Sequence, residues 1–235
     1  MRIRTAGRHA LLLEWTVAAR ADIETWRAEL HHRRDRGDLD AVEIVPAART
    51  ILLDGLSDPA ATARQLARWQ PRNGRHRNGP PGASPAAGSV PGRLSPLVTV
   101  PVQFDGPDLT AVAEHWGVDP ATAVDRLTGA DLQVAFCGFA PGFAYLSGLP
   151  AEWAVPRRSS PRPAVPAGAV ALAGEYAGIY PSASPGGWQL VGRTDLVLFD
   201  LDRDPPATLV PGTRVRLAHA DRSARDRSGC DRSGR

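Results

Sequence analysis

The pattern of polar and apolar residues in the first 70 positions predicts a small α/β unit. Residues 2–5 and 9–16 resemble two strands joined by a turn at Ala6-Gly7. From about Ala18 to Arg34 the apolar residues are three and four positions apart, which predicts a helix that Gly37 closes.

A hairpin and a second helix complete this unit. Residues 41–45 and 50–53 predict the two arms of the hairpin, around Pro46-Ala47-Ala48. In the helix that follows, Ser57 is the expected cap and Pro59 suits the first turn. The order strand, strand, helix, strand, strand, helix indicates an antiparallel sheet with both helices on one face.

The chain changes character after residue 70. Residues 71–96 are dominated by Gly, Pro, Ser and Arg and predict a disordered linker. A strand is expected over 97–104, where Pro101 favours an edge or a strand end. Two helices are expected next, at 109–116 with Asp108 as cap and from Asp119-Pro120 to about Leu127.

Short strands dominate the remaining sequence. They are separated by Gly and Pro turns and predict a β-barrel, at 134–139, 169–173, 188–191, 195–200 and 214–217. Residues 221–235 repeat Asp-Arg-Ser and predict a disordered tail. The sequence therefore predicts an α+β fold with domains at 1–70 and 97–220.

Composition excludes several functions. All 28 basic residues are arginine, so P-loop phosphate binding, Schiff-base chemistry, biotin attachment and Ser-Lys amidase chemistry are excluded for this chain alone. The linker carries four of these arginines and no acid, and the tail has five arginines and three aspartates. Without those two segments the net charge falls from +3 to −3, which argues against nucleic acid as a partner.

The two cysteines and six histidines indicate neither a disulfide framework nor a metal site. Cys137 lies in an apolar run typical of a small buried side chain, and the histidines lack ligand spacing. Residues 2–21 resemble a signal peptide, but Glu14 interrupts the apolar stretch and Arg20 suits a cleavage site poorly. No apolar run reaches the roughly 20 residues of a membrane span. A cytoplasmic protein is therefore expected.

Three segments between Gly and Pro turns could carry chemistry. An aromatic wall is expected from Phe139, Pro141, Gly142, Phe143 and Tyr145. The second segment, 156–168, holds Arg157, Arg158, Arg162 and Pro166, and its prolines would hold the guanidinium groups ready for a carboxylate or phosphate. The third supplies Tyr180, Ser184, Gly187, Trp188, Gln189 and Arg193. Because Trp188 and Gln189 are adjacent on a strand, only one can point into a cavity.

Four motifs carry a resemblance to a known family. They read GFAPGFAYLSGLP (138–150), VPRRSSPRPAVPAGAVALAG (155–174), GIYPSASPGGWQLVGRT (178–194) and DPPATLVPGTRVRL (204–217). Together they resemble the family of 5-oxoprolinase B subunits, also called the sporulation kinase-inhibitor or allophanate hydrolase subunit 1 family. The first domain is similar through GRHALLLEW and VEIVPAARTILLD.

The resemblance implies a ferredoxin-like first domain followed by a cyclophilin-like β-barrel. It also implies an ATP-dependent opening of 5-oxoproline to glutamate, carried out with an A subunit and a sister-barrel C subunit. ATP, with Mg²⁺, is then expected to be supplied to the complex, and this chain would hold neither metal nor biotin. Arg158, Arg162 and Gln189 are the candidate catalytic residues, because fixed guanidinium groups stabilise an oxyanion or phosphate.

Two departures leave the substrate open. Leu127 stands where many relatives have His, and Glu175-Tyr176-Ala177 replaces Gly-Gln-Thr. Three other interpretations remain: a non-catalytic regulator of a sensor histidine kinase, a component of a urea amidolyase or carboxyltransferase system, and a prolyl isomerase. The last of these rests on fold analogy alone.

Overall fold

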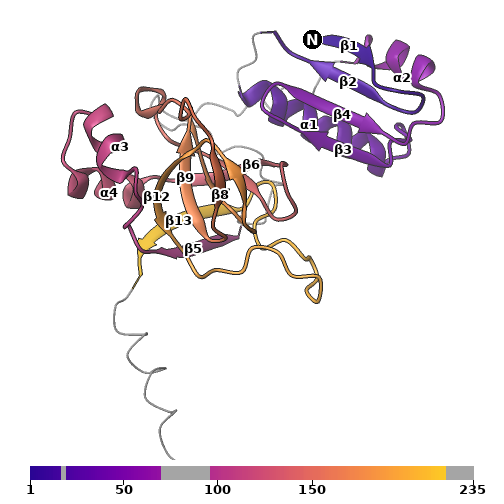
Figure 1. Ribbon diagram of the computed structural model, residues 1–235. Helices are drawn as coiled ribbons and strands as arrows, with labels where there is room; N and C mark the ends of the chain where they lie inside the picture. Colours follow the sequence, from indigo (N-terminus) through magenta and orange to yellow (C-terminus); the bar gives the residue numbers. More distant parts are fainter. Residues whose placement is uncertain (17–19, 70–95, 221–235) are drawn as a thin grey trace, which may run out of the picture. The chain divides into compact units, whose positions relative to one another are not determined.

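The computed structural model describes residues 1–16, 20–69 and 96–220 (Figure 1). The chain divides into two compact units, Met1–Ser95 and Pro96–Arg235. The predicted linker, apart from Pro96, and the predicted tail lie outside the described residues. No helix within the described ranges combines the length and the apolar character needed to cross a membrane.

The N-terminal unit is a four-stranded antiparallel sheet with two helices. The strands follow the order β1-β2-β4-β3 and are β1 (Arg2–Thr5), β2 (Leu11–Glu14), β3 (Glu43–Pro46) and β4 (Thr50–Asp54). The helices are α1 (Arg20–Asp35) and α2 (Pro59–Leu66). The predicted order of elements is confirmed.

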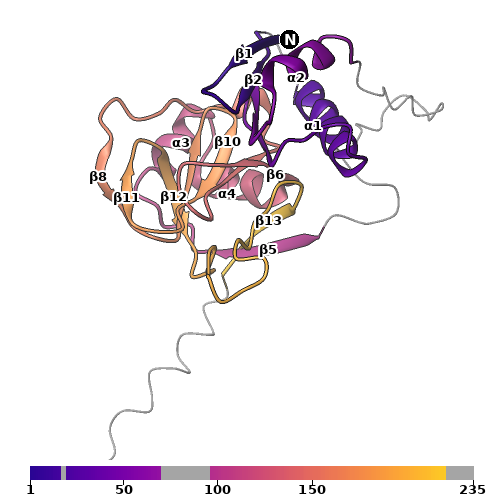
Figure 2. The ribbon, with the colours of Figure 1, turned by 90° about the vertical axis from the view of Figure 1, so that its right-hand side faces the viewer.

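Alternation along the strands decides which face of this sheet is covered. Leu11 and Leu13 on β2 are buried, and so are Ile51 and Leu53 on β4. These side chains share one apolar cluster with residues of both helices, Ile23, Trp26, Leu30 and Leu66. Both helices therefore cover the same face, as Figure 2 shows and as the sequence predicts.

The predicted cap of the second helix is wrong by one residue. The N-cap of α2 is Asp58, whose Oδ1 accepts a hydrogen bond from the Ala61 N–H at 2.9 Å. The Ser57 hydroxyl donates to Asp40 instead. Asp58 is the cap because its carboxylate, one residue after Ser57, accepts a hydrogen bond from a free N–H group of the first turn.

The C-terminal unit is built on a seven-stranded, barrel-like sheet. Its order is β12-β9-β10-β7-β6-β13-β5, from β12 (Gln189–Arg193), β9 (Ala169–Ala173), β10 (Tyr176–Ile179), β7 (Ala144–Ser147), β6 (Leu132–Cys137), β13 (Arg214–His219) and β5 (Leu97–Val102). A separate two-stranded sheet pairs β8 (Arg162–Val165) with β11 (Ser184–Gly186).

The two outer strands of the large sheet nearly meet. Just beyond β5, Gln103 exchanges backbone hydrogen bonds of 2.8 and 2.9 Å with Arg193 at the end of β12. A Cβ on Gly192 would lie 2.5 Å from the Gln103 carbonyl oxygen, so only glycine permits this approach. Pro101 lies on the outer strand β5, as its missing N–H predicts.

Two helices lie together beside this sheet (Figure 1). They are α3 (Leu109–His115) and α4 (Pro120–Gly129), and a short 3-10 helix, η1, follows at Ala151–Trp153. Asp119 caps α4 as predicted, with its carboxylate accepting from the Thr122 N–H at 3.0 Å. Asp108 is the cap residue of α3, but its side chain makes no cap hydrogen bond.

One predicted strand is absent and four short ones were missed. Residues 195–200 form no strand. Their backbone groups make hydrogen bonds within the same loop, for example from the Thr208 N–H to the Leu198 carbonyl at 2.9 Å. The missed strands have three or four residues each and are β7, β8, β10 and β11. Such short segments carry too few positions for a period to show.

Candidate functional site

A single buried carboxylate joins three segments of the C-terminal unit. Asp108 Oδ1 accepts hydrogen bonds from Arg158 Nη1 at 3.1 Å and from Arg162 Nη2 at 2.8 Å. Its Oδ2 accepts from the Leu190 N–H at 2.7 Å. Asp108 therefore ties the start of α3 to the arginine segment, defined here as Pro156–Val165, and to strand β12.

The surroundings keep Asp108 ionised. Burial alone would raise the pKa of this carboxyl, but the hydrogen bonds from Arg162 and Leu190 and the charges of Arg162 and Arg158 hold the pKa below its ordinary value. One negative charge thus faces two guanidinium groups. Arg157, the residue before Arg158, is exposed and adds a third positive charge. The arginine segment therefore carries more positive charge than Asp108 neutralises.

One hydrogen-bond donor of Arg162 is unpaired among the described residues. Its Nη1 is buried and has no hydrogen-bond partner within the described part of the chain, and the same holds for Ser184 Oγ. Both residues belong to the β8–β11 pair, where Gly186 lies opposite Arg162 and Ser184 opposite Val165. A buried N–H without a partner is costly, so Arg162 Nη1 is suited to an anionic oxygen of a ligand.

Tyr180 lies against this pair of strands. A Cβ on Gly186 would be 2.3 Å from the Tyr180 hydroxyl oxygen, so the absent side chain makes room for the phenol. Burial raises the pKa of Tyr180, and the charges of Arg157 and Arg162 oppose the rise. Burial raises the pKa of Tyr145 too, again opposed by Arg157. Both phenols therefore stay protonated at neutral pH and can donate hydrogen bonds close to the arginines.

The predicted aromatic wall is mostly core. Phe143 is buried at the centre of the cluster, 5.2–5.6 Å in edge-on contact from the rings of Phe139, Tyr180 and Trp188. Trp188 is buried too, so of the adjacent pair it is Gln189 that reaches the surface region. Tyr180 is buried against Phe143 as well, and Phe139 is the exposed ring of the group.

Gln189 and Arg193 take different roles from the Asp108 pair. Gln189 Nε2 donates to the Pro156 carbonyl at 3.0 Å and so anchors the start of the arginine segment. Arg193 forms an exposed ion pair with Asp105 at 3.0 Å and does not bond to Asp108.

The other predicted binding residues shape the backbone. Gly142 has a positive φ of 81° and packs so closely that a Cβ would lie 2.7 Å from Phe199 Cβ. The Gly187 carbonyl accepts the Arg158 N–H at 2.8 Å. Pro141 and Pro166 are exposed turn positions.

The positions that depart from the family pattern also have clear places. Leu127 is fully buried in the main core of the unit, so it supports packing. Tyr176 follows the β9–β10 turn and contacts the rings of Phe136 and Tyr145.

Cys137 is half-buried, and its thiol donates a hydrogen bond to the Leu209 carbonyl at 3.4 Å. Burial raises the pKa of this thiol, which makes Cys137 a poor nucleophile.

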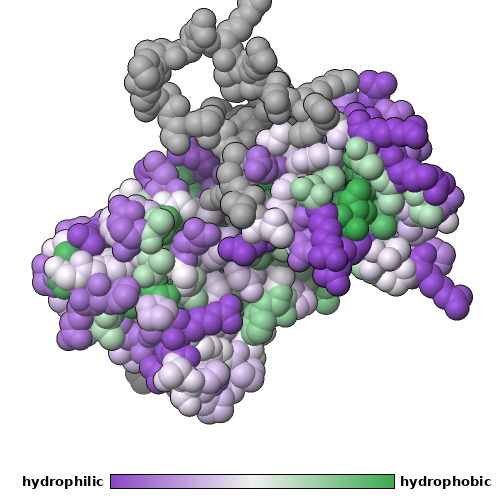
Figure 3. Space-filling view, turned by 90° about the horizontal axis from the view of Figure 1, so that it is seen from above, coloured by the Kyte–Doolittle hydropathy of each residue, from purple (hydrophilic) through white to green (hydrophobic). Residues whose placement is uncertain are grey.

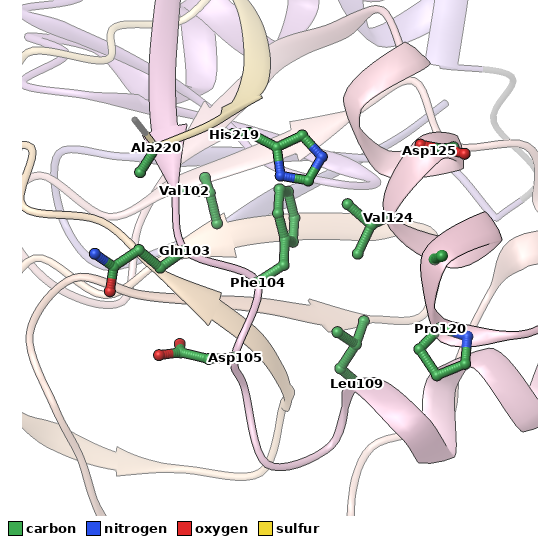
Figure 4. A pocket seen from close by; sticks show the side chains of 11 residues that line it. Val102, Gln103, Phe104, Asp105, Leu109, Pro120, Val124, Asp125, His219 and Ala220 are labelled. Carbon is green, nitrogen blue, oxygen red and sulfur yellow. The ribbon is translucent and has the colours of Figure 1, made fainter. Parts of the chain in front are cut away.

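Two hollows of the C-terminal unit lie away from the Asp108 cluster. One, of about 560 Å³, is lined by residues of the β5 end, α4 and the end of β13, where Phe104 and His219 stack edge-on at 5.4 Å (Figure 4). Another, of about 250 Å³, adjoins Arg193. We favour the Asp108 cluster as the site because it holds buried donors that need an acceptor, whereas Asp105 at the first hollow is already paired. Among the described residues, no three His, Cys, Asp or Glu side chains are placed to hold a metal ion.

Sequence reasoning missed Asp108. The residue stands directly before α3 and is therefore interpreted as an ordinary helix cap. Its partners are 50, 54 and 82 positions away along the chain, and no local pattern reports such contacts. Asp108 follows a proline and precedes a mostly apolar turn, and this local sequence does not mark it as a site residue.

Comparison with known proteins identifies the family of this chain. Residues 1–209 match the family described as carboxyltransferase domain, subdomain C and D. The chain belongs to this family. The B subunit of 5-oxoprolinase from Escherichia coli O157:H7 is 46% identical over 126 residues, which are 52% of this chain and 58% of the relative. The protein of the same name in Bacillus subtilis (strain 168) is 44% identical over 124 residues, 52% of each protein. The chain thus spans about half the length of the curated relatives it matches.

Solved structures extend the comparison to the fold. TTHA0988 superposes with a TM-score of 0.67 at 28% identity, covering 94% of this chain and 40% of the longer one. The Kluyveromyces lactis urea carboxylase gives a TM-score of 0.63 at 19% identity, covering 93% of this chain and 22% of that protein. The second likeness shows the shared fold alone. The mixed α/β architecture with a nearly closed seven-stranded sheet therefore recurs inside larger chains.

Proposed function

We propose that this chain is the B subunit of a multi-subunit, ATP-dependent 5-oxoprolinase, which hydrolyses the lactam 5-oxoproline to glutamate together with an A and a C subunit. The curated relatives that are named as B subunits of 5-oxoprolinase support the assignment, since they are 40–46% identical over about half of the chain. We also propose that the N-terminal unit is ferredoxin-like and the seven-stranded sheet cyclophilin-like.

The observation that carries the chemistry is the free donor of Arg162. Its Nη2 is held by Asp108 at 2.8 Å, which fixes the plane of the guanidinium, while Nη1 is buried without a partner. A fixed, desolvated guanidinium group attracts an anionic oxygen more strongly than a mobile one in water does. In this proposal Nη1 receives an oxygen of the substrate carboxylate, of a phosphate or of the developing oxyanion.

Neighbouring side chains complete the proposed site. Arg158 shares the Asp108 carboxylate and Gln189 anchors the backbone before the arginines. Tyr180 offers a protonated phenol and Arg157 a solvent-exposed charge. These groups bind and orient an anion, and a nucleophile or general base would come from a partner protein of the complex.

The same residues fit a nucleotide's phosphate groups but offer no magnesium ligands. Arg162 Nη1 is a buried donor without a partner, as a phosphate oxygen requires, so Arg157, Arg158 and Arg162 would face the phosphates of ATP. Bound ATP would supply phosphoryl transfer to the lactam oxygen. We propose that Mg²⁺ arrives with the nucleotide and is held by the A or the C subunit.

The test is ATP-dependent glutamate release from 5-oxoproline by this chain with and without its A and C partners. Activity is expected only in the full mixture. In that mixture, Arg162→Lys should lower kcat by about 100-fold, because lysine keeps the charge and loses the fork that reaches both Asp108 and the ligand. Arg214→Lys, an equally conservative change at an exposed arginine, should leave kcat unchanged.

A urea-utilising system is the second candidate. The K. lactis urea carboxylase and urea amidolyase share the fold at 19% identity. Urea is small and uncharged, unlike 5-oxoproline. If urea is the substrate, no mixture of subunits should release glutamate from 5-oxoproline. Urea-dependent ATP hydrolysis with a biotin-carrying partner would then replace the first proposal.

A further inference from the structure

Residues 195–209, which form most of the connection between β12 and β13, are held by their own polar groups. Thr208 Oγ1 donates to the Val197 carbonyl at 2.7 Å and accepts from Arg203 Nη1 at 3.1 Å. The Asp202 N–H donates to Asp200 Oδ1 at 3.1 Å, and Phe199 pairs with Ala207 in a backbone bridge. The loop is therefore preformed, although it is not part of the sheet.

The same loop exposes apolar side chains. Leu201 is 82% exposed and Val197 50% exposed. The turn that contains Phe139, which is 62% exposed, adjoins this loop through the close approach of Gly142 to Phe199. We call Phe139, Pro141, Val197 and Leu201 the loop-end surface.

Few large hydrophobic side chains are exposed in the described part of the molecule. Figure 3 shows one face, on which hydrophobic residues form small patches between hydrophilic ones. Three of the seven large hydrophobic side chains that are exposed among the described residues belong to the loop-end surface. In addition, Phe139 has φ at +72°, a left-handed conformation that a bulky residue rarely adopts. A strained backbone that presents an exposed aromatic ring is typical of a functional surface.

The rim of this surface is acidic. The segment 200–204 has three acidic residues, Asp200, Asp202 and Asp204, and one basic residue, Arg203. Arg203 forms an ion pair with Asp200 at 3.1 Å. A complementary surface would combine an apolar groove with arginine or lysine at its edge. A preformed apolar projection also loses little conformational freedom on docking, which favours recognition by a protein.

We propose that the loop-end surface docks the partner C subunit, with Leu201 inserted into an apolar groove that basic residues border. This inference rests on the proposed function. Two comparisons support a protein occupant: the relatives are named as one subunit of an enzyme, and in TTHA0988 the matching part is only 40% of a longer chain.

The test uses titration calorimetry to measure the affinity of the full-length chain for the purified C subunit. Leu201→Asp should weaken binding by about 30-fold or more, as expected for a central apolar contact placed against a charge. Leu97→Asp, the same change at an exposed leucine on the outer strand β5, should bind like the wild type. Thermal unfolding of both variants should match the wild type and so show that both fold.

The outcomes separate this inference from the proposed function. If the wild-type mixture releases glutamate and Leu201→Asp binds and works like the wild type, the surface proposal is wrong and the subunit role stands. If the wild type does not bind the C subunit and the mixture is inactive, both fail. If the wild type self-associates and Leu201→Asp is monomeric, the occupant is a second copy of this chain and the proposal is overturned.

Discussion

Two segments of the C-terminal unit present opposite chemistry to their surroundings. The arginine segment, Pro156–Val165, presents charged groups that a buried carboxylate fixes from below. The 195–209 loop bonds its polar groups to one another and presents leucine and valine. Each is held in one geometry, by Asp108 in the first case and by Thr208 in the second.

The difference shows how two segments of one unit can serve different recognition tasks. Fixed guanidinium groups with one donor left free select a small anion, because direction and charge decide such binding. Fixed apolar groups select a surface, because burial of area decides it. In our two proposals the arginine segment binds substrate or nucleotide and the 195–209 loop binds a partner protein. The following experiments test this contrast.

The largest effect is expected from Asp108→Asn. The change removes the charge that pairs with Arg158 and Arg162 and leaves Arg162 buried beside an amide. The free energy of unfolding should fall by about 3 kcal/mol, the low end for breaking a buried pair, because Arg158 is about a third exposed. Urea denaturation measures this. Asp119→Asn, at the cap of α4, is the control and should cost less. An equal loss there would show that the pairing of Asp108 with Arg158 and Arg162 adds nothing beyond an ordinary cap.

Gly186→Ala should come next. A Cβ at this position would lie 2.3 Å from the Tyr180 hydroxyl, so the phenol or β11 must shift, at a cost of about 1–3 kcal/mol in unfolding free energy. Adding Tyr180→Phe should recover part of the loss, because it removes the nearest atom. A double variant no more stable than Gly186→Ala alone would place the strain in the strand and not at the phenol.

The pH dependence of stability should report the same carboxylate. The pKa of Asp108 in the folded protein is below the ordinary value of 3.8 that it takes in the unfolded chain. Its stabilising contribution is therefore present above pH 3.8 and is lost as the pH falls below that value through the folded pKa. Unfolding free energy measured down to about pH 2.5 should fall more steeply for the wild type than for Asp108→Asn. Parallel curves would contradict the assignment.

Leu201→Ser should have the smallest effect on stability. Its side chain is 82% exposed, so the unfolding free energy should change by less than about 0.5 kcal/mol. Leu198→Ser in the same loop is the matched comparison, because Leu198 is buried in the core and its loss should cost about 2–4 kcal/mol. Equal costs would show that Leu201 contributes to folding and not to docking.

The sequence by itself determined the elements whose signals are local. Apolar spacing predicted α1, proline and aspartate predicted the start of α4, and Pro101 predicted an outer strand. These signals act within a few residues, where side chains choose the backbone conformation directly. The sequence also brought forward Arg158 and Arg162, because prolines surround them.

Only the tertiary structure decided which of those residues work together. Asp108 joined the site and Arg193 left it because pairing depends on contacts across 50 or more positions. Phe143 and Trp188 became core and Leu201 became surface, although all three are apolar. The physical reason is that the local pattern states what a side chain prefers, whereas tertiary contacts decide which preferences are satisfied. Here β8 and β12 meet Asp108 before α3, and these contacts leave the donor Arg162 Nη1 free.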